Sequence, residues 1–273
     1  MKKKTPVLGV LFLLSSLGAN HLYAETDTDE VQKIRLILEK KQASVEVIRR
    51  GRVLKDDKLK EDFLFESEDQ IRVEEGAFAE IKGPSFVLSI PEKSIVQIDR
   101  VSEEGTPSVI TVIYGHLRAK FSRDRKIPVA DLLRIRTLNA VTAVTALNSN
   151  GVADYLVHVT KNEAEYFKLL DRVSEPAAPA ASVERKNQGS LPLIKTLNET
   201  KIYKDLYTRI NVFRGTVSFK NTAEGTEEQS ISKTATGGQF LEQFGSSASK
   251  EQKPGSIDTK DATQLLKSLK LAS

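Results

Sequence analysis

The chain of 273 residues contains no cysteine and no tryptophan, and aromatic residues make up only 6% of it. Disulfide bonds, thiolate metal ligands and cysteine nucleophiles are therefore excluded, and stability has to come from packing. Scarce aromatics argue against a carbohydrate site built on stacked rings, although Phe and Tyr can supply a weaker one. Apolar residues reach 39%, which is enough to bury the core of one large or two small domains.

The N-terminus has the three-part form of a secretory signal. Residues 2–4 are lysines, an apolar run extends from Pro6 to about Leu17, and Ala24 precedes an acidic stretch. Such a run is too short to span a bilayer comfortably. We predict a signal peptide over residues 1–24 and a periplasmic or secreted protein with no stable transmembrane helix after cleavage. The alternative is an uncleaved N-terminal anchor.

The positive charge of the chain belongs largely to this signal. Removing Lys2, Lys3 and Lys4 from the 41 basic residues leaves 38 against 37 acidic ones. A mature chain without a basic excess has no electrostatic attraction for a polyanion. We therefore expect no nucleic-acid partner.

The stretch from Asp69 to Phe121 predicts the fold. Runs rich in Ile, Val and Phe are separated by clusters of Gly, Pro, Glu and Ser, a rhythm typical of short antiparallel strands. We predict an all-β fold, either an antiparallel sandwich or a β-roll or solenoid. Gly76 and Gly83 are expected where the chain reverses, and Pro84 and Pro91 at strand ends or edges.

Two distant segments share one pattern. VITVIYGHLRAKF, around Gly115, and INVFRGTVSFKN, around Gly215, both carry alternating apolar residues on either side of a central glycine. A strand pair broken by a glycine that permits a kink or bulge accounts for each segment. The recurrence fits either a structural repeat or chance similarity between two β segments.

Composition divides the mature chain. Residues 25–42 are predicted to be a leader, acidic at first and then compatible with helix or strand. The β-domain is predicted over residues 43–239, with Lys55 to Asp62 as a solvated, mixed-charge turn. An insertion at about 162–205 contains a Pro- and Ala-rich linker.

The C-terminal part changes character. Residues 240–257 are predicted to be a flexible linker, and residues 258–273 an amphipathic helix capped by Asp258 or Thr259. Its apolar face has helical spacing and consists of Ala262, Leu265, Leu266 and Leu269. The helix either docks on its own β-domain, which is the simpler interpretation, or binds a partner.

No reactive constellation is recognisable in the sequence. His158 alternates with valines, as on one face of a strand, and His116 is expected at a turn after Gly115. Neither an H-x-x-x-H spacing nor a G-x-S-x-G elbow occurs. The acidic residues Glu74, Glu75, Glu80 and Glu103 are interpreted as solvent faces and turns. We predict no catalytic, cofactor-binding or metal-binding residues and no cofactor.

The residues DQIRVEEGAFAEIKGPSFVLSIPEKSIVQIDRV, from Asp69 to Val101, resemble the FecR family of bacterial envelope proteins. In this region that family has a charged turn, short strands and a Pro-x-x-Ser turn, and VIYGHLRAKF and INVFRGTVSF resemble its Gly-centred strand pairs. The resemblance extends from about Ala43 to Gln239. It implies a β-domain that binds another protein in sensing, signalling or assembly.

Two features depart from the family pattern. Thr137-Leu138 replaces the usual Thr-Pro, and AVTALNSNG stands where Arg-Gly-Thr is expected. Sigma-regulating members also carry a cytoplasmic segment before their transmembrane helix, whereas only three lysines precede the apolar run here. We therefore expect a FecR-like protein that lacks the cytoplasmic anti-sigma segment.

Three classes of function are compatible with these observations. The leading one is non-enzymatic binding of an envelope protein of unknown identity, with an exposed edge strand as the means of contact. The second is a module that contacts cell-wall polysaccharide. The third is a hydrolase with two carboxylates in a cleft, because sequence spacing does not reveal which carboxylates meet in space.

Overall fold

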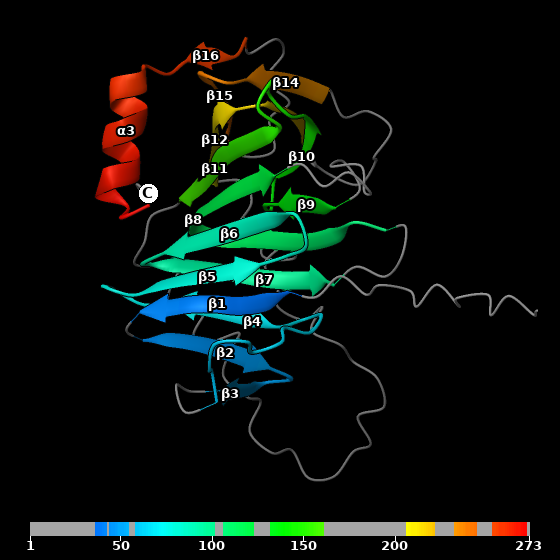
Figure 1. Cartoon of the computed structure of the whole chain (residues 1–273), viewed down its shortest axis with the longest axis vertical. Coiled ribbons are helices and arrows are strands. Elements are labelled where there is room, and N and C mark those ends of the chain that lie inside the picture. Colours follow the sequence, from blue (N-terminus) through cyan, green and yellow to red (C-terminus); the bar gives the residue numbers. More distant parts are fainter. Residues whose placement is uncertain are drawn as a thin grey trace, which may run out of the picture. The chain divides into compact units, whose positions relative to one another are not determined.

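The computed structural model describes residues 36–42, 44–54, 58–101, 106–122, 132–160, 206–221, 232–244 and 253–271. These residues form sixteen strands, β1 to β16, and the helix α3, arranged as Figure 1 shows. The predicted signal peptide and the insertion at about residues 162–205 lie outside the described residues.

The first layer is an antiparallel sheet with the strand order β1-β5-β6-β8-β11-β12-β15-β16. The bounds of its strands are β1 Ile37–Gln42, β5 Phe78–Lys82, β6 Phe86–Pro91, β8 Ser108–Ser122, β11 Val152–Thr160, β12 Tyr207–Arg214, β15 Gln239–Phe244 and β16 Gly255–Ser256.

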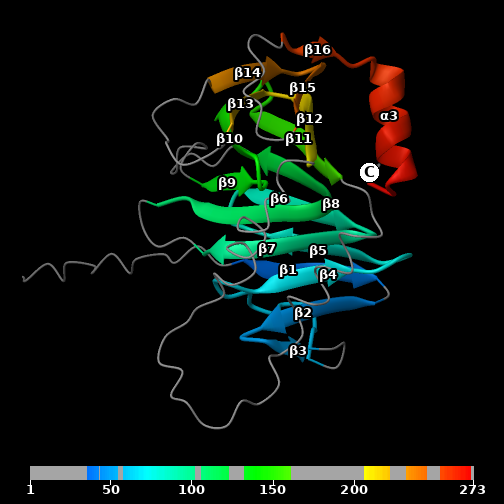
Figure 2. The same ribbon diagram turned by 180° about the vertical axis from the view of Figure 1, so that it is seen from behind.

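The second layer has the order β3-β2-β4-β7-β8-β9-β10-β13-β14, and all its described pairs are antiparallel except β8 with β9. The bounds of its other strands are β2 Val45–Arg49, β3 Arg52–Leu54, β4 Gln70–Val73, β7 Ser94–Arg100, β9 Leu133–Arg136, β10 Ala140–Ala146, β13 Thr216–Asn221 and β14 Ser232–Thr236. In both views the strands run from β3 at one end to β14 and β16 at the other (Figures 1 and 2).

The strand β8 belongs to both layers. Its N-terminal half pairs with β7 and β9 as far as Tyr114, and from Gly115 onward it pairs with β11 and then also with β6. Gly115 has φ +84°, and a Cβ there would lie 2.5 Å from the carbonyl oxygen of Lys93. Since only glycine adopts this conformation in such confined space, Gly115 is the point at which the strand leaves one layer and enters the other.

Gly215 marks a second change of layer, in the opposite direction. It separates β12 of the first layer from β13 of the second and has φ +78°. A Cβ at this position would lie 2.8 Å from the carbonyl oxygen of Ala146. Both glycines that the sequence predicted to permit a kink therefore occupy kinks, and both kinks connect the two layers.

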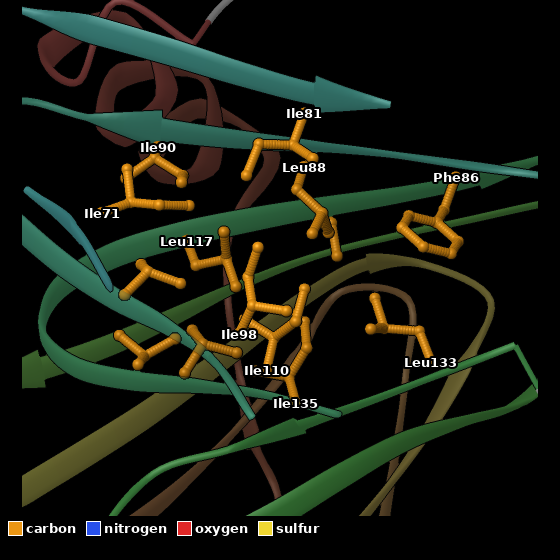
Figure 3. Close-up of a cluster of buried hydrophobic side chains, with 14 of the residues drawn as sticks. Ile71, Ile81, Phe86, Leu88, Ile90, Ile98, Ile110, Leu117, Leu133 and Ile135 are labelled. Atoms are coloured by element: carbon orange, nitrogen blue, oxygen red, sulfur yellow. The ribbon is translucent and has the colours of Figure 1, made fainter. Parts of the chain in front are cut away.

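One hydrophobic core lies between the layers (Figure 3). Ile81 and Leu117 enter it from the first layer, and Ile98, Ile110 and Ile135 enter it from the second, all with no exposed surface. The prediction of an all-β fold is confirmed, and its architecture is sandwich-like. Burial of apolar side chains from both layers is its main source of stability, since the chain has no disulfides.

The predicted turn residues occupy turns. Gly76 lies between β4 and β5, and Gly83 lies between β5 and β6. Pro84 follows Gly83 in the second of these turns, and Pro91 is the last residue of β6, so neither proline interrupts the middle of a strand. These predictions are confirmed.

Strands continue beyond the boundaries predicted at residues 43 and 239. β1 begins at Ile37, and Leu36 and Leu38 beside it are buried in the core. At the other end β15 extends to Phe244 and buries Leu241, while β16 lies within the predicted flexible linker. Both regions are rich in charged or polar residues, and such residues are frequent on strands near sheet edges.

The predicted charged turn contains one core residue, Leu59. Leu59 is fully buried within the predicted charged turn, of which residues 58–62 are described, and it anchors that turn to the core. The C-terminal helix is confirmed as α3, Thr259–Ser268, with the Asp258 carboxylate accepting a hydrogen bond from the Lys260 amide at 2.8 Å. Among the described residues, no helix has the length and apolarity needed to cross a membrane.

We predict that Gly115→Ala lowers the free energy of unfolding by about 2–5 kcal/mol, because it combines left-handed backbone strain with a collision against Lys93 and Ser94. The matched control is Gly76→Ala, which has φ +73° but no atom within 4 Å of the added Cβ. The control is expected to cost only about 1 kcal/mol. Urea unfolding followed by circular dichroism measures both, and equal losses would contradict the role assigned to Gly115.

Candidate functional site

A polar surface covers part of the first layer on the side that faces away from the core. Along β8 and β11, Leu117 and Val157 point into the core, so His116, Arg118 and His158 point to the opposite side. The helix α3, red in Figures 1 and 2, lies beside this layer. We call the outer face of β8, β11 and β12 beneath α3 the helix groove.

The helix groove contains a cavity of about 310 Å³. His116 and His158 line it from β8 and β11, Arg209 lines it from β12, and Asp261 and Leu265 line it from α3. The cavity is thus enclosed partly by the sheet and partly by the helix, and we call it the histidine cavity.

The two histidines form a stacked pair. They are direct cross-strand partners in the β8–β11 pairing, and their ring centroids lie 4.0 Å apart with planes 9° from parallel. In the described part of the chain, neither imidazole makes a side-chain hydrogen bond. Burial, and then the neighbouring His158, lower the pKa of His116 to about 3, while burial and the positive charge of Arg209 lower the pKa of His158. Both rings are therefore neutral at neutral pH.

A buried ion pair lies next to the histidines. Arg118 of β8 donates from Nε to Oδ1 of Asp154 at 2.9 Å and from Nη2 to Oδ2 at 2.7 Å. The side chains of Arg118 and Asp154 are only 6% and 8% exposed. Arg118 Nη1 also donates to the carbonyl oxygen of Leu271, just after α3. The ion pair therefore joins β8 to β11 and holds the C-terminal end of the α3 segment.

A second charged cluster forms the other side of the groove. Arg209 donates from Nη1 to Glu242 at 3.2 Å and from Nε to Asn211 at 2.9 Å, and its guanidinium lies 3.9 Å from the ring centroid of Phe240. The Tyr207 hydroxyl donates to the same Glu242 carboxylate. Burial and Glu242 raise the pKa of Tyr207 to about 12. Glu242 therefore neutralises Arg209 within the cluster.

The acid and base groups around the histidine cavity are few among the described residues. A general base needs a carboxylate or similar group to orient it, and neither histidine has one among the described residues. Asp261 is the one carboxylate lining the described histidine cavity, and Asp154 is committed to Arg118. Within the described residues, no three His, Cys, Asp or Glu side chains are placed to hold a metal ion.

The acidic residues singled out in the sequence do not meet at one site within the described residues. Glu74 and Glu75 are exposed in the β4–β5 turn, and Glu80 lies on the outer face of β5, 3.4 Å from the Ser89 hydroxyl. Glu103 lies outside the described residues. His116 is inside β8, so its predicted position at a turn is wrong, because Gly115 kinks the strand without ending it.

The histidine pair is the feature that sequence reasoning missed. His116 and His158 are separated by 42 residues and meet only because β8 and β11 pair in one particular register. The alternation of His158 with valines identified its strand but carried no signal for its partner.

A second exposed surface lies at the end of the second layer. β3 is the outermost described strand there and pairs with β2, and Val53 in its middle is 47% exposed. Leu64, whose carbonyl oxygen accepts a hydrogen bond from Arg49 of β2, is 49% exposed. These two are the most exposed large apolar side chains that the structure describes. Leu64 itself bridges to Ile37 of β1 in the first layer, so we call Arg52–Leu54 alone the β3 edge.

We predict that the histidine pair makes stability pH-dependent. Because the folded-state pKa values lie below the usual 6.5, the unfolded chain binds more protons than the folded chain below that pH. The free energy of unfolding should be fully present above about pH 6.5 and fall as the pH decreases, by up to about 1.4 kcal/mol per pH unit for each histidine. Urea titrations at pH 7.5, 6 and 5 should show this slope, and it should flatten in the His116→Gln, His158→Gln double variant.

We predict that Asp154→Ala destabilises the protein by about 3–5 kcal/mol, because it leaves the buried Arg118 guanidinium without its counter-ion. The double variant Arg118→Met, Asp154→Leu removes both charges and should lose less than the single variant. Urea unfolding of the two proteins tests the order, and a double variant at least as destabilised as the single one would show that the pair does more than neutralise charge.

Comparisons with known proteins give two distant structural matches. Two crystal structures from Parabacteroides distasonis, each described as a "putative anti-sigma factor", resemble the chain at 12% and 11% identity, both with a TM-score of 0.40. The likeness covers 72% of this chain but only 64% and 63% of those chains, so this chain spans less than two thirds of their length. No protein-family model matches the chain, and no curated protein matches it significantly. Similarity at this level establishes neither a shared fold nor a shared function.

Proposed function

We propose that the protein is a non-enzymatic component of the bacterial envelope that binds another protein in sensing, signalling or assembly. The form of its N-terminus supports export to the periplasm or beyond, and the resemblance of Asp69 to Val101 to the FecR family supports the envelope role. In this proposal the contact with the partner is made by the β-domain.

The observation that carries this proposal is the β3 edge. An outer strand offers unpaired backbone groups to an extended segment of another protein, and exposed apolar side chains along it add affinity. Val53 supplies such a side chain, and the exposed Arg52 lies next to it. The partner segment that fits this edge is therefore extended, with an apolar residue opposite Val53 and an acidic residue beside it.

The charge arrangement supports a non-enzymatic role. Buried charges in the described β-domain are mostly committed to structural pairs: Asp69 accepts two hydrogen bonds from Arg49, at 2.8 and 2.7 Å, and Asp154 accepts two from Arg118. A hydrolase of the two-carboxylate type needs one acid and one base free to exchange protons with substrate. Paired carboxylates of this kind are better suited to holding strands together.

We predict that a photoreactive amino acid at Val53 captures a partner protein in the native envelope. The control position is Thr234 on β14, which is exposed on the outer strand at the opposite end of the second layer. A protein adduct at residue 53 and none at residue 234 is expected. The substitution Val53→Asp should abolish capture by a probe at Arg52, which is exposed on the same strand, while changing the free energy of unfolding by no more than about 0.5 kcal/mol, because Val53 is exposed.

The absence of any adduct at residue 53 in every growth condition would contradict the proposal, and so would equal capture at residues 53 and 234. Retention of the mature protein on purified peptidoglycan, undisturbed by Val53→Asp, would favour the polysaccharide-binding alternative.

A further inference from the structure

The helix α3 is thinly packed for an element that covers a sheet. It is amphipathic, yet none of the residues Thr259–Ser268 is buried. Leu265, Leu266 and Leu269, on its apolar face, all remain partly exposed. A surface helix is normally held by burial of such a face. α3 is therefore held mainly by its ends.

Two anchors flank the helix. Upstream, Gly255–Ser256 pairs with β15. Downstream, Leu271 is only 5% exposed, and its carbonyl oxygen accepts a hydrogen bond from Arg118. The Leu271 anchor is small, since it consists of one apolar side chain and one hydrogen bond.

The space between the anchors is incompletely filled. The histidine cavity of about 310 Å³ lies under the first half of α3, and a second cavity of about 250 Å³, lined by Phe78 and Lys120, lies under Leu269 to Leu271. Both cavities are partly open to solvent. The surface beneath α3 can therefore accept more side-chain volume than α3 supplies.

The groove has the chemistry of a helix-binding surface. Leu156, on the outer face of β11, is fully buried at its centre and provides an apolar floor. Arg209, which is paired with Glu242, lies on one side of it and Lys120 on the other, so the positive charge available to an occupant comes mainly from the Lys120 side. The present occupant matches this pattern, because Leu265 and Asp261 line the histidine cavity and Leu269 lines the second cavity.

We propose that the helix groove is a second protein-binding site, which receives an amphipathic helix of a partner protein and which α3 occupies as a built-in competitor. The partner helix carries a leucine stripe at i, i+3, i+4 and i+7 and an acidic residue in its first turn, and its larger side chains fill the two cavities. Binding is controlled by release of the Leu271 anchor. The surface is distinct from the β3 edge, and the inference rests on the proposed function only in that the partner is a protein.

A labelled synthetic peptide with the sequence of residues 253–273 serves as the probe, and its affinity for the full mature chain is measured by fluorescence anisotropy. Leu271→Asp in the protein weakens the intramolecular competitor, whereas the peptide retains its own leucine. Affinity for this variant should be at least about tenfold higher than for the unmodified protein, because a tethered competitor acts at a high effective concentration. The control peptide carries Leu265→Asp and Leu269→Asp and should not bind.

A reversible lock tests the site even if Leu271→Asp fails to fold. The chain has no cysteine, so Asn211→Cys with Leu265→Cys introduces the only thiols, and both positions line the histidine cavity. Crosslinking the two thiols across the cavity with a bismaleimide that contains a reducible disulfide should abolish peptide binding, and reduction of the linker should restore it.

Equal peptide binding in the crosslinked and reduced forms would overturn the proposal, and so would the absence of binding to both Leu271→Asp and the reduced protein. A concentration-dependent dimer of Leu271→Asp that the lock abolishes would overturn the choice of occupant and assign the groove to α3 of a second copy. Capture at Val53 that persists while the peptide fails to bind would leave the proposal for the β3 edge intact, so the two proposals fail separately.

Discussion

The passage of β8 from one layer to the other is the constraint on which the rest of the structure depends. One strand of 15 residues pairs with β7 and β9 in the second layer and with β6 and β11 in the first. Two separate sheets would be held together only by apolar contact, whereas here backbone hydrogen bonds link them continuously. The left-handed conformation at Gly115 makes this possible, and the serine at position 94, whose hydroxyl accepts a hydrogen bond from the His116 amide at 3.0 Å, closes the kink.

The sequence predicted what depends on neighbouring residues. Gly76, Gly83, Pro91 and the Asp258 cap act through local backbone geometry, and each occupies the position expected for it. The sequence did not predict the features that depend on which strands pair and in which register. The β1 segment looked like a leader because its charged residues gave no sign that Leu36 and Leu38 belong to the core. The contact between His116 and His158 depends on a pairing register that one strand alone does not specify.

Stability alone does not account for the polarity of the helix groove. Burying the Arg118–Asp154 pair costs desolvation, and apolar residues of similar volume are often at least as stabilising in such a position. The two neutral histidines add a further cost below pH 6.5, because their burial disfavours protonation. A face kept polar at this cost, and covered by a helix that buries none of its own residues, has the properties expected of a surface that another molecule can reach.

The crossing of β8 between the layers at Gly115 accounts for both the kink and the outer face of the helix groove. Before Gly115 the core residues Ile110, Val112, Ile113 and Tyr114 do not alternate strictly, because the pairing with β7 has an irregularity between Ile95 and Val96. After Gly115 the odd-numbered residues Leu117, Ala119 and Phe121 face the core. Because successive side chains of a strand point to opposite faces, His116 and Arg118 lie on the outer face beneath α3. The glycine that joins the layers thus also determines which side chains the groove displays, and the surface proposed for binding follows from the way the core is closed.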